Sequence, residues 1–480
     1  MNYETVIGLE VHVELATESK IFCSCTTKFG GAPNTHCCPI CTGMPGTLPT
    51  LNRKVLDYAV TAGLALNCEI QKNNRFDRKN YFYPDLPKAY QISQLYMPFA
   101  RNGKVEITTR SGVTKNIGIH EIHMEEDAGK LIHSETDGIT LTDYNRCGVP
   151  LIEIVSEPDF RSADEVIAYL EKIKSIFEYL GISDCKMQEG SMRCDVNLSV
   201  REVGSETLGT RTEMKNLNSF RGIERAIKFE SERQIRAIEA GEKIVQETRR
   251  WDDLKGVGYA MRTKENAQDY RYFPEPDIPP IVISDDTVNR ILTAMPEFAD
   301  AKAKRYNEQF GLSKADAELV ASSKHLAELF EKTVELTGNP KEVRYWLVGQ
   351  IYYLMNEKGI APEDIKLSPE MFAEFVNIAS SDRINKQAGK IVFEAMFMSP
   401  ERFDIEGFIK EKGLEQVDDT ETIRSAVREV INNNPKTVQQ YLSGQTKVVG
   451  FFVGQVMKAT CGKAKPDTVN KLVNEELNKL

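Results

Sequence analysis

The sequence predicts an α+β protein: an antiparallel, β-rich domain, then a helical domain, then a small all-helical C-terminal tail domain. Short runs of alternating apolar and polar residues, separated by Pro- and Gly-containing turns, dominate residues 1–293. Amphipathic helical patterns joined by short polar loops dominate residues 294–405, and a second helical block covers residues 406–480. We therefore expect domain boundaries near residues 293 and 405.

Bulk composition limits the classes of function. With 480 residues the chain is too long for one ordinary core, and its 41% hydrophobic and 28% charged content is that of a soluble globular protein. A net charge of −10 excludes a general polyanion binder, so any nucleic-acid contact must use a local basic surface. No apolar run reaches the roughly 18 residues of a membrane span, and the N-terminus lacks a secretory pattern. We expect a cytoplasmic protein without a membrane partner.

The first predicted strand has the sequence IGLEVHVEL, residues 7–15. Its odd positions are all apolar, whereas Glu10, His12 and Glu14 occupy the opposite face. This face is either an ordinary solvent-facing surface or the floor of a metal and phosphate site.

Cysteines cluster directly after this strand. Cys23 and Cys25 form a Cys-x-Cys pair, and Cys38 and Cys41 form a Cys-x-x-Cys pair after twelve intervening residues. Two such pairs around a short Gly- and Pro-containing loop are typical of structural tetrahedral Zn²⁺. Cys37 is one residue too far from Cys41 for a zinc knuckle. Four reduced cysteines without metal remain the alternative.

The next segment, FDRKNYFYPDLPKAYQISQ over residues 76–94, interleaves basic side chains such as Lys79 with aromatic ones. Such a mixture can stack bases and neutralise phosphates. A loop that folds its aromatic rings into the core is the alternative interpretation, and both stay open.

Polar strand faces recur in four later segments. They comprise Glu121, His123, Glu125 and Asp127; Glu153 and Glu157; Arg193, Asp195, Asn197 and Ser199; and Arg211, Glu213 and Lys215. A solvated sheet face explains any single strand. Repeated carboxylates on neighbouring strands, however, repel one another unless a cation lies between them. Mg²⁺ prefers such oxygen ligands and leaves positions open for phosphates, while the basic residues could clamp phosphate oxygens. No P-loop motif is present, so any ATP must bind without one.

Two helices and a connector complete the first domain. Ser162, Glu165 and Gly181 supply the N-cap, capping box and C-terminal stop of one helix, and the second covers residues 219–241. The proline-rich residues 272–283 predict an extended connector. In the tail, residues 430–480 hold seven lysines against three acidic residues. This excess marks either a solvated helical face or a small surface for phosphate backbones.

Several of these segments resemble the B-subunit family of the glutamyl/aspartyl-tRNA amidotransferases. The resemblance rests on IGLEVHVEL, CPICTGMPGTLP, DRKNYFYPDLPKAYQISQ, HMEEDAGK, NRCGVPLIEIVSEPD, MRCDVNLSV, KNLNSF, QETRRWDD, DYRYFPEPDIPP and, in the tail, GFFVGQVMKAT. It runs nearly from end to end, and several motifs are long and specific.

The resemblance implies a cradle-shaped β-rich kinase domain, a helical domain and a tRNA-contacting tail in a heterotrimer. An amidase A subunit releases ammonia from glutamine, and a small C subunit fastens the assembly. The B subunit uses ATP and Mg²⁺ to phosphorylate the side-chain carboxylate of misacylated Glu-tRNA(Gln) or Asp-tRNA(Asn), and ammonia then displaces the phosphate. The sequence lacks the Gly/Ser-rich stretch with a neighbouring Lys that an amidase nucleophile needs, which agrees with ammonia from another polypeptide.

On this basis we assign expected roles to individual residues. The main Mg²⁺ ligands are expected to be Glu10, His12 and Glu125, with Asp195 and Glu213 as further ligands or groups that hold its waters. Lys79, Arg193 and Lys215 are expected at phosphates or the acceptor end of the tRNA. Asp127, Glu153 and Glu157 are weaker candidates, and Glu14 is expected to face solvent. A non-catalytic tRNA-binding scaffold is the alternative function; the dense carboxylates disfavour it, because an RNA-binding face would be basic.

Overall fold

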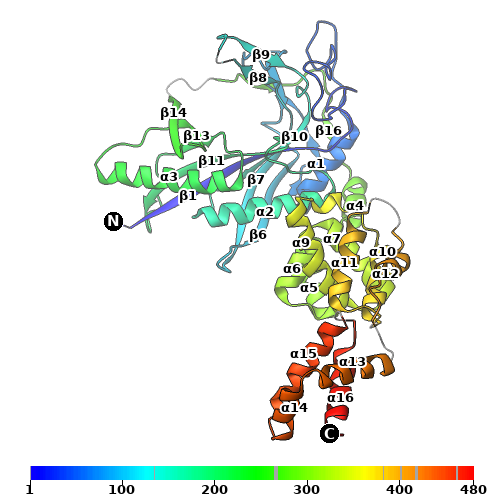
Figure 1. Ribbon diagram of the computed structural model, residues 1–480. Helices are drawn as coiled ribbons and strands as arrows, with labels where there is room; N and C mark the ends of the chain where they lie inside the picture. Colours follow the sequence, from blue (N-terminus) through cyan, green and yellow to red (C-terminus); the bar gives the residue numbers. More distant parts are fainter. Residues whose placement is uncertain are drawn as a thin grey trace. The chain divides into compact units, whose positions relative to one another are not determined.

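A nine-stranded sheet forms the centre of the first of two units, Met1–Phe298 and Ala299–Leu480, in the computed structural model (Figure 1). The structure describes residues 2–134, 136–263, 269–381, 383–399, 403–416, 420–460 and 463–480. The sheet-rich first unit and the helical second unit confirm the predicted α+β class. The division of the helical part into two domains at residue 405 stays a prediction.

The central sheet is antiparallel except for one parallel pair, β12 with β13. Its strands, in spatial order, are β14 (Val257–Thr263), β13 (Glu247–Asp252), β12 (Thr212–Lys215), β11 (Met192–Glu202), β1 (Tyr3–Glu14), β10 (Pro150–Ser156), β7 (Thr114–Glu126), β6 (Ala100–Thr108) and β2 (Glu69–Ile70). The opening strand of the sequence, β1, therefore lies in the middle of the sheet.

One face of this sheet is apolar and carries the core. The odd residues of β1 and its C-terminal neighbour, from Ile7 to Leu15, are at most 2% exposed. They share a core with helices α1 (Arg53–Ala65), α2 (Ala163–Leu180) and α3 (Phe220–Glu239). Figure 1 shows α2 and α3 along the same side of the sheet. Because side chains alternate along a strand, the polar residues of β1 lie on the opposite face.

Each of the two predicted helices of this unit begins directly after a serine that caps it. The Ser162 side chain accepts a hydrogen bond from the backbone of Glu165, and Gly181 ends α2 in the left-handed conformation with φ 66°. Ser219 caps α3 in the same way by accepting from the backbone of Gly222. The predicted N-cap and C-terminal stop of α2 are confirmed. The Glu165 carboxylate accepts a 2.8 Å hydrogen bond from the backbone N–H of Arg161, one residue before the N-cap that a capping box would use.

Short strands surround the central sheet. They are β4 (Asp77–Asn80), β5 (Tyr90–Ser93) and β15 (Phe273–Pro274) in one small sheet, β3 (Asn73–Asn74) with β16 (Ile281–Val282), and the hairpin β8 (Lys130–His133) with β9 (Thr140–Asp143). The proline-rich connector supplies the short strands β15 and β16, with a bend at residues 276–278 between them. Helix α4 (Asp285–Thr293) follows it, and its Ile291 belongs to the core of the first unit.

The second unit consists of helices. They are α5 (Ala299–Phe310), α6 (Lys314–Ala321), α7 (Lys324–Thr337), α8 (Pro340–Trp346), a π-helical turn (Leu347–Ile351), α9 (Tyr352–Lys358), a 3₁₀ turn (Pro362–Asp364), α10 (Pro369–Ser380), α11 (Lys386–Phe397), α12 (Ile405–Lys412), α13 (Thr420–Asn432), α14 (Pro435–Leu442), a 3₁₀ turn (Thr446–Val448), α15 (Val449–Ala459) and α16 (Pro466–Leu477). Helices α13, α15 and α16 share a hydrophobic cluster that includes Val427, Phe452 and Leu472.

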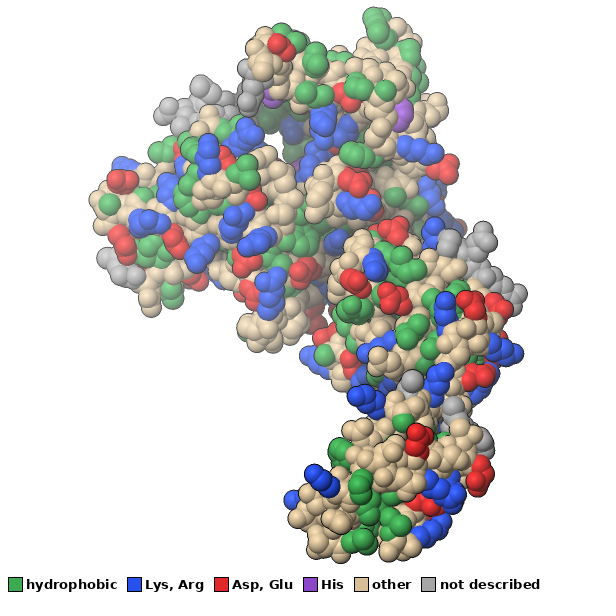
Figure 2. Space-filling model, viewed as in Figure 1, with side chains coloured by type: hydrophobic (Ala, Val, Ile, Leu, Met, Phe, Trp, Pro, Cys, Tyr) green, Lys and Arg blue, Asp and Glu red, His purple; other side chains and the backbone are tan. Residues whose placement is uncertain are grey.

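Acidic and basic side chains lie interspersed over the surface in Figure 2. The surface of the first unit is hollowed between the hairpin β8–β9 and the strand pair β13–β14, and Lys and Arg side chains lie on the wall of this hollow. Among the described residues, no helix combines the length and apolar character needed to cross a bilayer.

Candidate functional site

The strand register brings the predicted polar residues of the sheet together. His12 of β1 lies directly opposite Glu153 of β10 on one side and Arg193 of β11 on the other. Glu153 in turn lies opposite His123 of β7. One row across four strands therefore carries two imidazoles, a carboxylate and a guanidinium on the polar face.

His12, Glu125 and Glu153 form a first group, which we call the histidine–carboxylate triad. One ligand atom from each lies within 4.8 Å of the other two. His12 Nε2 lies 3.6 Å from Glu125 Oε1 and 3.7 Å from Glu153 Oε1. Ser93 on β5 donates a hydrogen bond of 3.1 Å to the second oxygen of Glu125. Two carboxylates and an imidazole at this spacing suit a hard divalent cation such as Mg²⁺ or Mn²⁺.

The two carboxylates of the triad differ in electrostatics. Glu125 is 3% exposed, and burial together with the nearby Glu153 raises its pKa. Burial also acts to raise the pKa of Glu153, but His12 and His123 outweigh it and hold that pKa below its ordinary value. Glu153 is therefore held ionised, whereas its surroundings disfavour the ionised form of Glu125. A bound cation would stabilise the ionised form of both carboxylates.

His123 lies beside the triad and contacts one of its carboxylates. Its Nε2 lies 2.9 Å from Glu121 Oε1, and its Nδ1 lies 3.6 Å from Glu153 Oε2. Burial acts to lower the pKa of His123, but the hydrogen bonds with these carboxylates raise it to about 10. His123 is therefore an imidazolium at neutral pH, and its charge fixes the orientation of Glu153.

A second group on the same face consists of Glu10, Asp195, Glu213 and Lys215, the carboxylate–lysine group. The three carboxylates offer oxygen atoms within 4.8 Å of one another. Lys215 Nζ lies 2.5 Å from Asp195 and 3.1 Å from Glu213, while the amide of Asn197 donates a 3.0 Å hydrogen bond to Glu10. Burial acts to lower the pKa of Lys215, but Asp195 and Glu213 raise it. An ammonium therefore already compensates these carboxylates.

The expected Mg²⁺ ligands thus fall into two neighbouring groups. His12 and Glu125 lie together, and Glu153 joins them, whereas Glu10 lies with Asp195 and Glu213. Glu153, one of the weaker candidates, has a more central position than the sequence indicated. Its alternation on β10 was visible, but only the register with His12 reveals the contact.

Arg193 lies at the edge of the triad in a group that the sequence did not reveal. Its Nη2 donates a 2.8 Å hydrogen bond to Asp127, whose same oxygen lies 3.2 Å from Arg146 Nε. The expectation that Glu14 faces solvent is wrong: it is partly buried, and burial and the nearby Asp127 raise its pKa to about 8. Glu14 is the last residue of β1, and Asp127, Arg193 and Arg146 act electrostatically on its carboxylate.

Lys79 on β4, one of the residues expected to contact a phosphate, lies beside aromatic rings. Its ammonium lies 5.0 Å from the ring centre of Tyr270 and 5.9 Å from that of Tyr81. Among the described residues no carboxylate lies within 4 Å of it, although it acts electrostatically on Glu125 and Glu153. A cation beside the triad, held by aromatic rings rather than by a salt bridge, is available for an anionic ligand.

The aromatic–basic segment has both buried and exposed rings. Phe76 is 1% exposed and belongs to the core, whereas Phe82 is 86% exposed. The segment is also not a simple loop, because its two ends form the paired strands β4 and β5.

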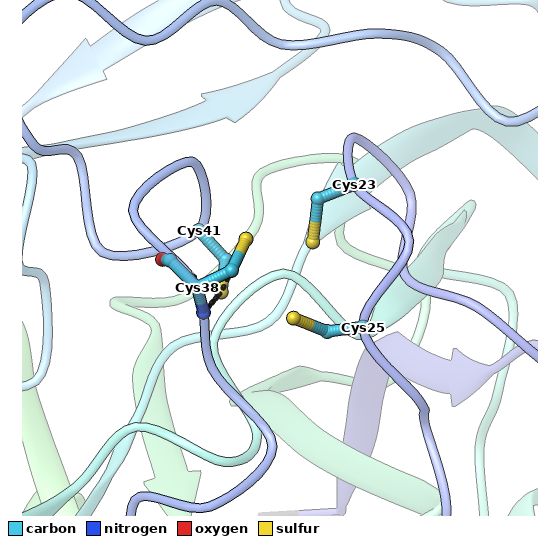
Figure 3. A group of neighbouring side chains, drawn as sticks. All are labelled: Cys23, Cys25, Cys38 and Cys41. Carbon is cyan, nitrogen blue, oxygen red and sulfur yellow. Dashed lines mark hydrogen bonds between the residues drawn. The ribbon is translucent and has the colours of Figure 1, made fainter.

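The cysteine cluster lies on two loops that face each other (Figure 3). Cys23 and Cys25 come from one loop and Cys38 and Cys41 from the other, with their sulfur atoms turned toward a common centre and within 4.8 Å of one another. Cys37 lies outside this set, and its thiol donates to the Asn34 carbonyl at 3.3 Å.

The donor set fits tetrahedral Zn²⁺. Four sulfur ligands meet, and the backbone N–H of Cys38 donates a 3.1 Å hydrogen bond to the sulfur of Cys41, as expected for a thiolate knuckle. The hydrogen bond between Cys23 and Cys41 lowers the pKa of Cys41 and raises that of Cys23, so these two thiols share one proton in the absence of metal. These observations favour a metal site over four unconnected thiols.

Comparisons with known proteins show the family of the chain. A family model described as the GatB/GatE catalytic domain matches residues 5–289, and one described as the GatB domain matches residues 328–477. A protein from Lachnoclostridium phytofermentans, named as the B subunit of an aspartyl/glutamyl-tRNA(Asn/Gln) amidotransferase, is 57% identical over 477 residues, or 99% of each chain. A protein of the same name from Caldicellulosiruptor bescii is 56% identical over 483 residues and covers 100% of both chains. The chain therefore belongs to the B-subunit family of the aspartyl/glutamyl-tRNA(Asn/Gln) amidotransferases.

Proposed function

We propose that this chain is the ATP-dependent kinase subunit of a tRNA-dependent amidotransferase, a carbon–nitrogen ligase with glutamine as amide donor. Its substrate is the side-chain carboxylate of misacylated Glu-tRNA(Gln) or Asp-tRNA(Asn). The names of its relatives support the amidotransferase class and a multi-subunit assembly. The observation that carries the kinase assignment is the histidine–carboxylate triad beside the cation Lys79.

A carboxylate is a poor electrophile, so the reaction needs a better leaving group. An oxygen of the substrate carboxylate attacks the γ-phosphorus of ATP, the bond from that phosphorus to the β-phosphate oxygen breaks, and ADP leaves. Ammonia then attacks the acyl carbon of the acyl phosphate, and inorganic phosphate departs with the C–O bond electrons. The nitrogen passes one proton to the departing phosphate, which leaves the amide. The protein's task in the first step is to align the reactants and compensate charge.

The residues divide this task. His12, Glu125 and Glu153 would hold Mg²⁺, which supplies charge compensation for the phosphates when bound. His123 orients Glu153, and Lys79 offers an ammonium to a phosphate or to the substrate carboxylate. Glu10, Asp195 and Glu213 either complete the metal environment through water or position Lys215 for a phosphate. Arg193 would hold an anionic group at the other edge of the triad.

The remaining parts supply structure and partners. Cys23, Cys25, Cys38 and Cys41 would hold a structural Zn²⁺ with no open ligand position. Ammonia would come from glutamine through an amidase A subunit, and a small C subunit would complete the complex. The helical tail, with its excess of lysines, would contact the tRNA backbone.

The test measures ADP release by the assembled amidotransferase without glutamine. The proposal predicts release that requires Mg²⁺ and rises with Glu-tRNA(Gln) or Asp-tRNA(Asn), but not with correctly charged Gln-tRNA(Gln). The same ADP release with either class of tRNA would contradict it.

A further inference from the structure

Lys20 is fully buried, although it precedes the first cysteine of the cluster by only three residues. Its backbone N–H donates a 3.0 Å hydrogen bond to the carbonyl of Cys25, which ties it to the first cysteine loop. Its side chain reaches toward the second loop, where Nζ lies 3.7 Å from the sulfur of Cys41. Lys20 thus contacts both halves of the cluster.

The Lys20 ammonium has no carboxylate partner within 4 Å in the part of the chain that the structure describes. Lys88, which lines the same cavity of about 110 Å³, is by contrast paired with Glu126. An isolated ammonium in a protein interior is strongly unfavourable unless a negative group compensates it. The group in contact with it is the sulfur of Cys41.

The charge of a metal-bound cluster provides that compensation. Four thiolates around one Zn²⁺ carry a net charge of about −2. This charge is itself unfavourable in a protein interior, and Cys41 is only 5% exposed. We propose that Lys20 is a positioning residue of the zinc centre: its ammonium donates to the zinc-bound thiolate of Cys41 and halves the uncompensated charge. Lys20 therefore controls how tightly the metal is held, without binding it.

The experiment compares zinc retention in the full chain. Lys20→Met keeps an unbranched side chain, shorter by one atom, and removes the charge. Lys28→Met is the matched control because Lys28 is exposed in the same cysteine segment. Competition with a chromophoric chelator should show zinc affinity about 10–100-fold lower in Lys20→Met and unchanged in Lys28→Met. Equal affinities in Lys20→Met and the unmodified chain would overturn the proposal.

Two further measurements test the proposal even if Lys20→Met does not fold. Lys20→Gln keeps an N–H donor but no charge, so its zinc affinity should fall between those of the unmodified chain and Lys20→Met. A crystal structure of the zinc-loaded unmodified chain should place Lys20 Nζ within 4 Å of the metal-bound sulfur of Cys41. A lysine turned toward a carboxylate or toward solvent would overturn the proposal.

The result is independent of phosphoryl transfer, because zinc is measured rather than turnover. Purified chain with one zinc and a clear Lys20 effect, but no ATP-dependent chemistry, would contradict the kinase assignment alone. Purified chain that holds no zinc would overturn the role of Lys20 and leave the kinase assignment standing.

Discussion

His12 and Glu153 lie directly opposite each other on β1 and β10, with Nε2 of the histidine 3.7 Å from Oε1 of the carboxylate. Glu125 approaches the same nitrogen at 3.6 Å from the next strand. The imidazole and the two carboxylates offer three ligand atoms within 4.8 Å of one another at the centre of the sheet, and this arrangement underlies the first prediction.

Replacing His12 by alanine should abolish most of the tRNA-dependent chemistry. His12→Ala removes one of three proposed ligands, so ADP release dependent on Glu-tRNA should fall by about 100-fold or more, while tRNA affinity stays within about threefold. His120→Ala is the control, because His120 is 60% exposed and pairs with Glu157 at the surface. Turnover unchanged in His12→Ala would remove β1 from the site.

Lys215 should act as a built-in cation of the carboxylate–lysine group. Lys215→Met removes the ammonium that pairs with Asp195 and Glu213, so the group should acquire affinity for a hard divalent ion. Mn²⁺ titration followed by electron paramagnetic resonance should then count about two sites per chain in place of about one. Lys255→Met, at an exposed ion pair with Asp252, should not change the count. An unchanged count in Lys215→Met would contradict this role.

The zinc ligand in the second loop should be Cys38 and not Cys37. Cys38→Ser removes one of the four converging sulfurs and should reduce zinc from about one per chain to a small fraction. Cys37→Ser changes only a thiol that donates to the Asn34 carbonyl, so its zinc content should match the unmodified chain. Elemental analysis after dialysis against chelator measures both, and loss of zinc from Cys37→Ser alone would reverse the assignment.

Glu230 should stabilise the β12 side of the sheet in a pH-dependent way. It is fully buried on α3, accepts a 2.9 Å hydrogen bond from Thr212, and pairs with Arg233 and Arg249. Burial acts to raise its pKa, but the hydrogen bonds with Arg233 and Gln234 outweigh it and lower the pKa from 4.5. Its stabilising contribution is therefore complete above about pH 4.5 and is lost as the pH falls through the lower folded-state value.

Glu230→Gln should lower the free energy of unfolding of the first unit by about 1.5–3 kcal/mol at pH 7, because it removes the charged hydrogen bonds with Arg233 and one of the two carboxylate partners of the buried Arg249. The difference from the unmodified chain should shrink below pH 4.5. Glu232→Gln, at a surface pair with Arg236, should cost less than about 1 kcal/mol. Denaturant unfolding at a series of pH values measures this, and a difference that grows in acid would show that the sign is wrong.

Local patterns of the sequence predicted the parts of this structure that depend on local physics. The alternation of β1, the Ser162 and Gly181 caps of α2, and the four-cysteine set all follow from spacing along the chain. The register between paired strands does not follow from such spacing, because no local pattern indicates that Glu153 lies opposite His12. The same is true of Glu14, whose neighbour Asp127 lies more than a hundred residues away along the chain.

Lys20 is another residue whose surroundings cannot be predicted from the local sequence. In the sequence it is one lysine in a polar stretch, which predicts a solvated side chain. Its side chain is instead fully buried and contacts Cys41, 21 residues along the chain, a tertiary contact that composition and periodicity do not encode.

The most direct measurement of the central claim traps the acyl phosphate. The assembled amidotransferase is supplied with ATP, Mg²⁺ and Glu-tRNA(Gln), without glutamine, and hydroxylamine is added to convert any glutamyl phosphate into a hydroxamate. We predict ATP-dependent hydroxamate on the tRNA-bound glutamyl side chain with one ADP formed for each, and its loss in His12→Ala but not in His120→Ala. Absence of hydroxamate with the unmodified chain, or equal amounts with His12→Ala, would contradict the assignment of the kinase site to this sheet.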